Sequence, residues 1–344
     1  MAEAWFWLGA RDRAEALEVA AARCGRPAHL LEKDIWVVWT LAALYGAPVG
    51  KSLTFKGGTS LSKVYRLIDR FSEDVDLTCD IRELVPDLLR DGNPIPATGS
   101  QEKKISAAVR NRLPGWIEAN VTPVLRAALA ASGQEATLTV AGSENEKLLL
   151  VYPALKTGTG YAAANVQLEF GARATGEPHK AYAVACDIAA EIPEVSFPTA
   201  TPTVMAAERT FWEKATAMHV YCLQGRLRGE RYSRHWYDLT AIAVSPYFTS
   251  ALADRALARQ VAEHKTAFFA AKDAQGDKID YFRAVSGAIE LVPEAEALAA
   301  LGRDYAAMLK DGLLARGAPE FAQVMNQCRE IEARINAASE GVRT

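Results

Sequence analysis

Two aspartates, Asp74 and Asp76, lie two residues apart in the sequence RFSEDVDL of residues 70–77. The pattern predicts a β-strand over 74–79, and alternate residues of a strand point to the same face of its sheet. Both carboxylates can therefore bind one or two divalent cations together. Such ions can activate an attacking hydroxyl and stabilise a leaving pyrophosphate. The pair thus predicts metal-dependent chemistry on a nucleotide.

A glycine-rich turn precedes the aspartates, in the sequence KGGTSLSK of residues 56–63. We expect a short strand over 52–56 to lead into this turn and a helix over 59–68 to follow it. The start of a helix offers backbone N–H groups and the positive end of a dipole to a phosphate. The candidate phosphate-binding residues in and around the turn are Lys56, Gly57, Gly58, Thr59, Ser60, Lys63, Arg70 and Ser72.

Several of these residues also have a purely structural interpretation. Thr59 and Ser60 are of the types that cap helix N-termini, a role compatible with phosphate binding. Lysines such as Lys56 and Lys63 are more often solvated than bound to a ligand. Arg70 has acidic neighbours in the sequence, so a surface salt bridge is its alternative to a contact with the triphosphate or the acceptor.

A third metal ligand is expected from a neighbouring strand that faces the same way. Glu169 is the candidate, because it is a lone acid in the predicted strand over 165–170, whose apolar residues alternate with polar ones. We expect Glu169 to join Asp74 and Asp76 at the metal. The alternative is that Glu169 is an ordinary solvent-facing strand residue.

Two further candidate catalytic residues, Lys214 and Asp238, lie in the second half of the chain. Lys214 falls on the apolar side of a predicted helix over 205–223, and a lysine turned toward a core needs a carboxylate or phosphate partner. Asp238 is a candidate to orient Lys214 or a metal-bound water. We therefore name four catalytic residues, which are Asp74, Asp76, Lys214 and Asp238.

A basic segment lies between these two residues, in the sequence RLRGERYSR of residues 226–234. Its four arginines, with Tyr232 among them and Trp236 and Tyr237 shortly after them, can bind a phosphate backbone and stack on bases. We expect this segment to contact the acceptor of the reaction. The alternative is a solvated basic loop that leads into a helix.

Composition places the chain among ordinary globular proteins. The 344 residues are 50% hydrophobic and 24% charged, and the net charge of −3 gives no bulk signal of a nucleic-acid binder. The five cysteines lack C-x-x-C spacing, which argues against a zinc cluster or a disulfide framework. Since no apolar run approaches the roughly 20 residues of a membrane span, and no signal pattern is evident, we expect a cytoplasmic protein.

The order of predicted elements indicates an α+β fold with two parts. Residues 1–200 read as a mixed α/β core with N-terminal helices, and residues 201–344 as a helical domain. Strands are predicted over 137–140, 148–152 and 165–170, after a helical stretch over 101–131 that prolines at 114 and 123 should interrupt. Helices of the second part are predicted over 205–223, 236–244, 250–270, 281–290, 294–312 and 319–338.

The combination of these motifs resembles the AbiEii/AbiGii family of nucleotidyltransferase-like toxins, from bacterial toxin–antitoxin and phage-defence systems. The motifs that carry the resemblance are KGGTSL at 56–61, RFSEDVDL at 70–77, Glu208 with Glu213-Lys214, and RHWYDL at 234–239. The resemblance extends to Glu32-Lys33-Asp34 near the N-terminus and to Asp304-Tyr305, Met308, Phe321 and Ile335-Asn336 in the tail.

The resemblance implies a core similar to the DNA polymerase β-type nucleotidyltransferases, a mixed sheet with flanking helices, completed by the C-terminal helical region. It implies Mg²⁺ or Mn²⁺ and a nucleoside triphosphate. The family's metal-binding aspartates match Asp74 and Asp76, its motif lysine and later aspartate match Lys214 and Asp238, and its serine before the metal pair matches Ser72.

The resemblance also implies partners. Some family members are similar to enzymes that add nucleotides to the 3′ end of tRNA and thereby block translation, and a cognate antitoxin is typically encoded alongside. The leading interpretation is therefore nucleotide transfer to RNA, most simply the tRNA acceptor end. The alternative is a nucleoside triphosphate-binding toxin, binding GTP in some members, that nucleotidylates a protein or inhibits its target by binding alone.

Overall fold

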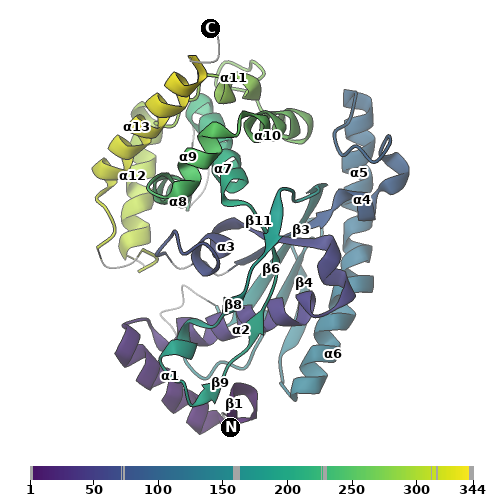
Figure 1. Ribbon diagram of the computed structural model, residues 1–344, viewed down its shortest axis with the longest axis vertical. Coiled ribbons are helices and arrows are strands. Elements are labelled where there is room, and N and C mark those ends of the chain that lie inside the picture. Colours follow the sequence, from purple (N-terminus) through teal and green to yellow (C-terminus); the bar gives the residue numbers. More distant parts are fainter. Residues whose placement is uncertain are drawn as a thin grey trace. The chain divides into compact units, whose positions relative to one another are not determined.

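The computed structural model describes residues 3–70, 72, 74–157, 163–225, 227, 231–310, 312–314 and 317–340 (Figure 1). The chain forms two compact units, which we call the sheet unit and the helical unit. The sheet unit comprises Met1–Val64, Ser72–Pro94 and Lys104–Met205. The helical unit comprises Tyr65–Phe71, Ile95–Lys103 and Ala206–Thr344.

Seven strands in the described part of the chain form one mixed sheet, in the order β4-β5-β6-β3-β2-β11-β7. β3 is parallel to β6 and β11 to β2, and the other neighbours are antiparallel. The strands are β2 Leu53–Lys56, β3 Asp74–Asp80, β4 Thr137–Ala141, β5 Lys147–Val151, β6 Asn165–Ala174, β7 His179–Ala181 and β11 Thr203–Met205. Two short pairs join β1 Glu3–Ala4 to β9 Val195–Ser196 and β8 Val184–Ala185 to β10 Thr199–Ala200.

Alternation along the central strands gives the sheet one apolar face. Val75 and Leu77 of β3 and Leu168 of β6 are completely buried, and burying each such side chain stabilises the fold by about 1.5–3 kcal/mol. Asp74 and Asp76, which alternate with them, are partly exposed. The predicted strand and the common face of its two aspartates are therefore confirmed.

Helices accompany the sheet in the first part of the chain, and α2 packs against β6 and α6. The predicted interruption of the helix over 101–131 is confirmed as a π-helical turn over Ile117–Val121, between the two prolines. The α-helices are α1 Ala10–Cys24, α2 Ala28–Tyr45, α3 Gly57–Lys63, α4 Ile81–Leu84, α5 Gly99–Trp116 and α6 Thr122–Ser132. Short 3₁₀ turns cover Trp5–Trp7, Pro48–Ser52, Pro86–Leu88 and Asp187–Ala190.

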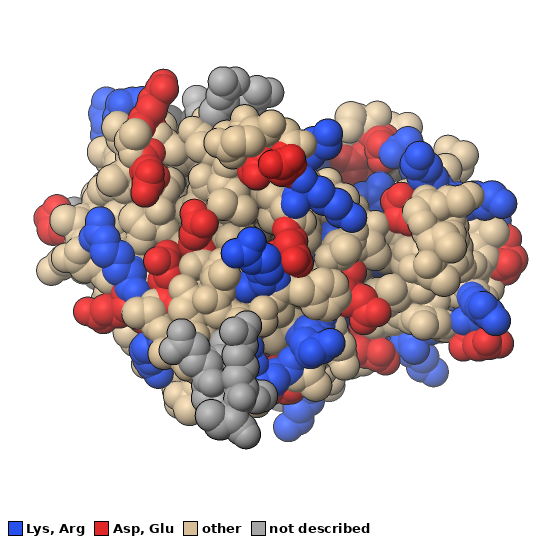
Figure 2. Space-filling model, turned by 90° about the horizontal axis from the view of Figure 1, so that it is seen from above, with Lys and Arg blue, Asp and Glu red and all other residues tan. Residues whose placement is uncertain are grey.

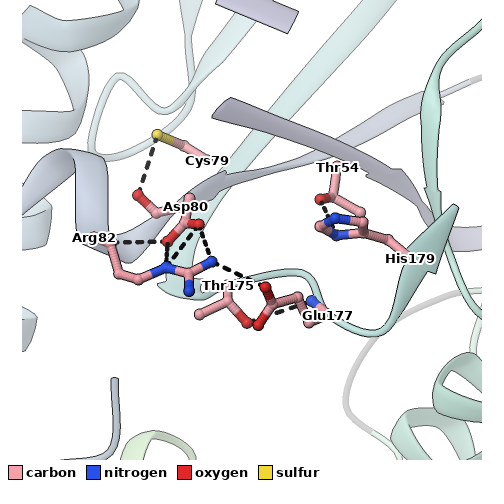
Figure 3. Close-up of polar contacts among 7 residues, drawn as sticks. All are labelled: Thr54, Cys79, Asp80, Arg82, Thr175, Glu177 and His179. Atoms are coloured by element: carbon pink, nitrogen blue, oxygen red, sulfur yellow. Dashed lines mark hydrogen bonds and ion pairs between the residues drawn. The ribbon is translucent and has the colours of Figure 1, made fainter. Parts of the chain in front are cut away.

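Polar contacts fasten the end of β3 that lies away from the aspartate pair (Figure 3). Arg82 donates to both carboxylate oxygens of Asp80 and, at 3.1 Å, to Glu177. On the neighbouring strand, the Thr54 hydroxyl lies 3.3 Å from Nδ1 of His179. These contacts connect β2 to the first residue of β7, and they connect the end of β3 and the start of α4 to Glu177, which precedes β7.

Helices make up the second unit of the chain. They are α7 Ala207–Gln224, α8 Ser233–Ala243, α9 Pro246–Ala253, α10 Arg255–Phe268, α11 Tyr281–Val285, α12 Ala295–Lys310 and α13 Phe321–Glu340. Together with the mixed sheet they confirm the predicted α+β class with flanking helices. Among the described residues, no helix combines the length and the apolar character needed to cross a membrane.

Several predicted helix boundaries were wrong, and three differences are the most informative. The helix after the glycine turn ends at Lys63 instead of residue 68. The predicted helix over 250–270 is two helices, because Asp254 ends α9 and its carboxylate accepts the N–H of Leu257 to cap α10. The predicted helix over 281–290 ends at Val285.

Candidate active site

The glycine turn lies directly against the carboxylate of Asp76. β2 and β3 are antiparallel, with Lys56 opposite Asp76, and the turn begins at the next residue. Gly57 has φ +78°, and a Cβ built at this position would lie 2.0 Å from Oδ2 of Asp76. Glycine is thus required here twice, for its left-handed backbone and for the space that the carboxylate occupies.

Replacing Gly57 with alanine is expected to lower nucleotide-transfer activity by about a hundredfold, because an ångström-scale displacement of a catalytic group has that effect. The new methyl group would push the Asp76 carboxylate away or rearrange the turn. Gly115→Ala is the matched control, since a Cβ there meets nothing within 4 Å and the position is helical. Equal activity of the two variants in a labelled-nucleotide assay would contradict the prediction.

Hydroxyl groups hold the turn to the start of β3. The Thr59 hydroxyl donates to the Asp74 carbonyl at 2.5 Å and lies 3.0 Å from the Ser72 hydroxyl. The Ser60 hydroxyl donates to the Gly57 carbonyl at 2.9 Å. Thr59 thus joins the turn to the backbone that carries Asp74, and Ser60 fixes the turn itself.

The capping role predicted for Thr59 and Ser60 is wrong. α3 already begins at Gly57, with Lys56 at the cap position and no side-chain capping bond. Gly58, Thr59 and Ser60 are buried inside the short helix. Their contribution to the site is to position the turn.

Lys63 is fully engaged within the protein. Its ammonium lies 2.6 Å from Oδ1 of Asp34 on α2 and 2.6 Å from Oδ1 of Asp187, with only 7% of the side chain exposed. Asp187 is also paired with Arg26. Burial acts to lower the pKa of Lys63, but the two carboxylates outweigh it and raise this pKa. The phosphate-binding role predicted for Lys63 is therefore not supported by its contacts.

Replacing Lys63 with methionine is expected to lower the free energy of unfolding by about 3 kcal/mol, since the Asp34 carboxylate would stay buried without its cation. Lys51→Met, at an exposed lysine of the same unit, should change it by less than about 0.5 kcal/mol. Urea unfolding at pH 7 measures both values. A loss below about 1 kcal/mol for Lys63→Met would show that the pair is not structurally important.

Four charged residues form a row across the sheet, which we call the charged row. Asp76 pairs in register with Lys56 on one side and with Glu169 on the other, and Glu169 pairs with Lys147 of β5. Residues directly opposite one another on neighbouring strands point to the same face. The charged row thus places two carboxylates between two ammonium groups, on the face that carries Asp74.

Glu169 lies next to Asp76 in the sheet, as predicted, but its carboxylate contacts a lysine. Oε2 of Glu169 lies 2.8 Å from Nζ of Lys147. This hydrogen bond raises the pKa of Lys147, and the field of Asp74 adds to the effect. Among the described residues, no three side chains of Asp, Glu, His or Cys come together as a metal-binding group.

The aspartate pair by itself fits a magnesium-type ion. Gln167 donates to Oδ1 of Asp74 at 3.3 Å, and the Asp76 carboxylate is seated against the turn. Mg²⁺ is usually held by one or two carboxylates, with substrate phosphates and water completing its shell. Two oxygen ligands beside a turn that approaches them closely match that requirement.

The helical unit contains a second charged cluster, centred on Asp238. Arg70 donates to both oxygens of this carboxylate, at 2.6 Å from Nε and 2.8 Å from Nη2. Nζ of Lys214 lies 2.8 Å from Oδ2 of Asp238. Asp238 is completely buried. The predicted pairing of Lys214 with Asp238 is confirmed, whereas Arg70 pairs with a residue that its sequence neighbourhood does not reveal.

Arg70 and Lys214 share the single carboxylate of Asp238. Despite burial, Arg70 and Lys214 hold the pKa of Asp238 well below its usual range. Burial lowers the pKa of Lys214, and the nearby Arg70 and Arg234 guanidinium groups lower it further. The Asp238 carboxylate acts in the opposite direction and raises this pKa. Among the described residues, one carboxylate thus pairs with two cations, which favours binding of a further anion.

His235 adds an uncharged polar group to the same cluster. Burial and the neighbouring Lys214 place its pKa well below the usual value, so the ring is neutral at pH 7. Its Nδ1 atom is buried and has no hydrogen-bond partner among the described residues.

Asp304 of α12 anchors the end of the arginine-rich segment. Its carboxylate accepts the backbone N–H of Arg231 at 2.6 Å and of Ser233 at 2.7 Å, and also the Ser233 hydroxyl. The contact fixes the entry to α8, the helix that carries Asp238. The other arginines of the segment, at 226 and 228, lie outside the described residues.

Side chains that the sequence did not single out complete both clusters. Gln167 lies in a predicted strand and Lys147 directly before one, and nothing in their spacing distinguishes them from other residues there. Asp304 was named only among the residues that resemble the AbiEii/AbiGii family. On the face drawn in Figure 2, basic and acidic side chains are interspersed, in keeping with the net charge of −3. The charged row and the cluster around Asp238 are therefore local groupings of charge.

Comparison with known proteins identifies one family. Residues 39–327 match the family described as "Nucleotidyl transferase AbiEii toxin, Type IV TA system". No curated protein matches the sequence. Among solved structures, MenT4, nucleotidyltransferase toxin Rv2826c from Mycobacterium tuberculosis H37Rv, is 16% identical, with a TM-score of 0.49 over 98% of this chain and 96% of that one. JHP933 from Helicobacter pylori is 13% identical, with a TM-score of 0.43 over 91% and 94%.

Proposed function

Because the chain belongs to the AbiEii nucleotidyltransferase toxin family of type IV toxin–antitoxin systems, we propose that it transfers a nucleotide from a nucleoside triphosphate to RNA. The acceptor we propose is the 3′ end of tRNA, whose modification would block translation. The observation that carries the proposal is the placement of Asp76, which lies against the glycine turn on the face that carries Asp74.

In this proposal Asp74 and Asp76 hold a divalent cation, Mg²⁺ or Mn²⁺. When bound, the cation would activate the acceptor hydroxyl and neutralise charge on the leaving pyrophosphate. Gln167 orients the first carboxylate by its hydrogen bond, and the close approach of Gly57 fixes the second. Lys56 lies opposite Asp76 on the same face, where its ammonium suits the triphosphate.

Lys214 neutralises phosphate charge during the reaction. The bidentate contact with Arg70 fixes the Asp238 carboxylate, and this carboxylate in turn fixes the lysine ammonium at 2.8 Å. Arg70 and Lys214 share one carboxylate, and this arrangement supports binding of an anionic ligand such as a phosphate group. Arg70 thus acts through Asp238, instead of by the direct contact with the triphosphate expected from the sequence.

The arginine-rich segment is our proposed contact to the acceptor. Arg234 lies on the first turn of α8, and Asp304 fixes the backbone that precedes it. Guanidinium groups beside aromatic rings suit an RNA acceptor, where phosphates and unstacked bases are both available. Membership of a toxin–antitoxin family implies an antitoxin as the regulatory partner.

The acceptor can be tested by the state of tRNA after treatment. Total tRNA is incubated with the protein, Mg²⁺ and the four nucleoside triphosphates, and then repurified and charged with amino acids. Loss of aminoacylation that requires both protein and nucleotide would support the proposal. Fully chargeable tRNA together with labelled protein would instead favour nucleotidylation of a protein, and bound nucleotide without any transfer would favour inhibition by binding.

A further inference from the structure

The charged row contains two residues that the proposed chemistry does not use, Glu169 and Lys147. Of these two, Lys147 is the cation. It lies on β5, directly opposite Glu169, which lies directly opposite Asp76. The Lys147 ammonium is 2.8 Å from the Glu169 carboxylate. The position next to the aspartate pair that a third acidic ligand would take is thus occupied by an ion pair.

From this placement we propose that Lys147 competes with the divalent cation for Glu169 and so sets the affinity of the aspartate pair for metal. This inference rests on the proposed function, because it requires Asp74 and Asp76 to bind a cation. With the lysine in place, Glu169 is neutralised and the site has two acidic ligands. When the ion pair opens, Glu169 becomes available as a third one.

The exposure of the pair allows this exchange. The Glu169 side chain is 45% exposed and that of Lys147 is 25% exposed, and ion pairs in contact with water are weak. A divalent cation held by Asp76 on the adjacent strand attracts the same carboxylate with twice the charge of an ammonium. The glutamate can therefore move between two partners at small cost, which a buried pair could not do.

A cross-strand lysine–glutamate pair is also an ordinary way to stabilise a sheet. What separates the two roles here is the register, because the same glutamate neighbours Lys147 on one side and Asp76 on the other. A merely structural pair would change the stability of the protein when broken but would leave its affinity for metal unaltered. Metal affinity is therefore the quantity to measure.

The test is a Mn²⁺ titration of the full-length protein, followed by electron paramagnetic resonance of free Mn²⁺, with no nucleotide present. We expect Lys147→Met to tighten Mn²⁺ binding about fivefold, because the Glu169 carboxylate would then be available to the cation as a third acidic ligand. Lys147→Arg, which keeps the ion pair, should bind as the wild type does. Lys104→Met, at an exposed lysine of α5, is the matched control and should also leave the affinity unchanged.

A double-mutant cycle then asks whether the effect passes through Glu169. Removing the lysine should have no effect in the Glu169→Gln background, where the two partners no longer compete for a carboxylate. Equal tightening in both backgrounds would show that Lys147 acts by its charge alone and would overturn the inference. Unchanged affinity of Lys147→Met in the presence of Glu169 would overturn it as well.

Failure of the proposed function would look different. If the wild type binds Mn²⁺ no better than Asp76→Asn does, the aspartate pair is not a metal site, and both the inference and the metal-dependent mechanism are wrong. If the wild type binds Mn²⁺ through Asp76 and the Lys147 variants do not differ from it, only the inference fails.

Discussion

Replacing Asp76 with alanine is expected to abolish growth inhibition and to lower nucleotide transfer by about 10³-fold or more, as does the loss of a group that stabilises transition-state charge. Asp76 is the carboxylate against which the glycine turn packs, and it is one of the two acids in the charged row. The protein should remain folded, because this side chain lies on the partly exposed face of β3. Induced expression in cells and a labelled-nucleotide assay measure the two effects.

Asp80→Ala is the matched control for this prediction. Asp80 lies at the opposite end of the same strand, where it pairs with Arg82 (Figure 3). Its variant should inhibit growth as the wild type does. Growth inhibition that persists in Asp76→Ala, at equal protein levels, would contradict catalysis by the aspartate pair.

Replacing Asp238 with asparagine is expected to lower the free energy of unfolding by about 3–5 kcal/mol, since one partner of a buried ion-pair network is removed. Arg70 and Lys214 would both lose their carboxylate. Nucleotide transfer should fall as well, because the lysine would no longer be fixed. Urea unfolding and the transfer assay, performed on the same preparations, measure the two losses.

The difference in unfolding free energy between the wild type and Asp238→Asn should depend on pH. The reason is the pKa of Asp238, which Arg70 and Lys214 lower in the folded state despite burial. A lowered pKa stabilises the fold above the unfolded value of about 3.9, and the contribution disappears as the pH falls toward the folded value. The stability gap between wild type and Asp238→Asn should therefore be constant from about pH 5 to 8 and shrink below about pH 4. A gap that grows on acidification would contradict the assigned charge state.

Lys214→Met separates the catalytic role of the cluster from its structural role. This variant keeps the bidentate contact between Arg70 and Asp238, so it should lose less stability than Asp238→Asn while losing transfer. If Lys214→Met retains full transfer activity, the lysine is structural and does not act on phosphate.

The local parts of the site could be predicted from the sequence. Period-two alternation placed Asp74 and Asp76 on one face of a strand, and the same pattern placed Glu169 on a neighbouring strand with the same orientation. The apolar face of its helix predicted that Lys214 needs an anionic partner, and Asp238 is that partner. Each of these inferences uses a regular repeat within one segment.

The remaining contacts depend on tertiary structure, for which a single sequence has no signal. Arg70 and Asp238 are 168 positions apart and meet only because the segment around residue 70 belongs to the helical unit. Lys63 follows the glycine turn, where a phosphate-binding lysine is expected. Its ammonium instead pairs with Asp34 and Asp187, which lie in distant parts of the sequence. The ion pair of Lys147 required the register of β5 and β6.

Transfer of an α-labelled nucleotide to tRNA, measured for the wild type beside Asp76→Ala, tests most directly whether the aspartate pair catalyses nucleotidyl transfer to RNA. Purified protein is incubated with Mg²⁺, total tRNA and each of the four labelled nucleoside triphosphates. We predict label on the tRNA with the wild type and none with the variant, together with release of pyrophosphate. Label transferred equally by both proteins would contradict catalysis by the pair, and bound nucleotide without label on tRNA would contradict the RNA acceptor.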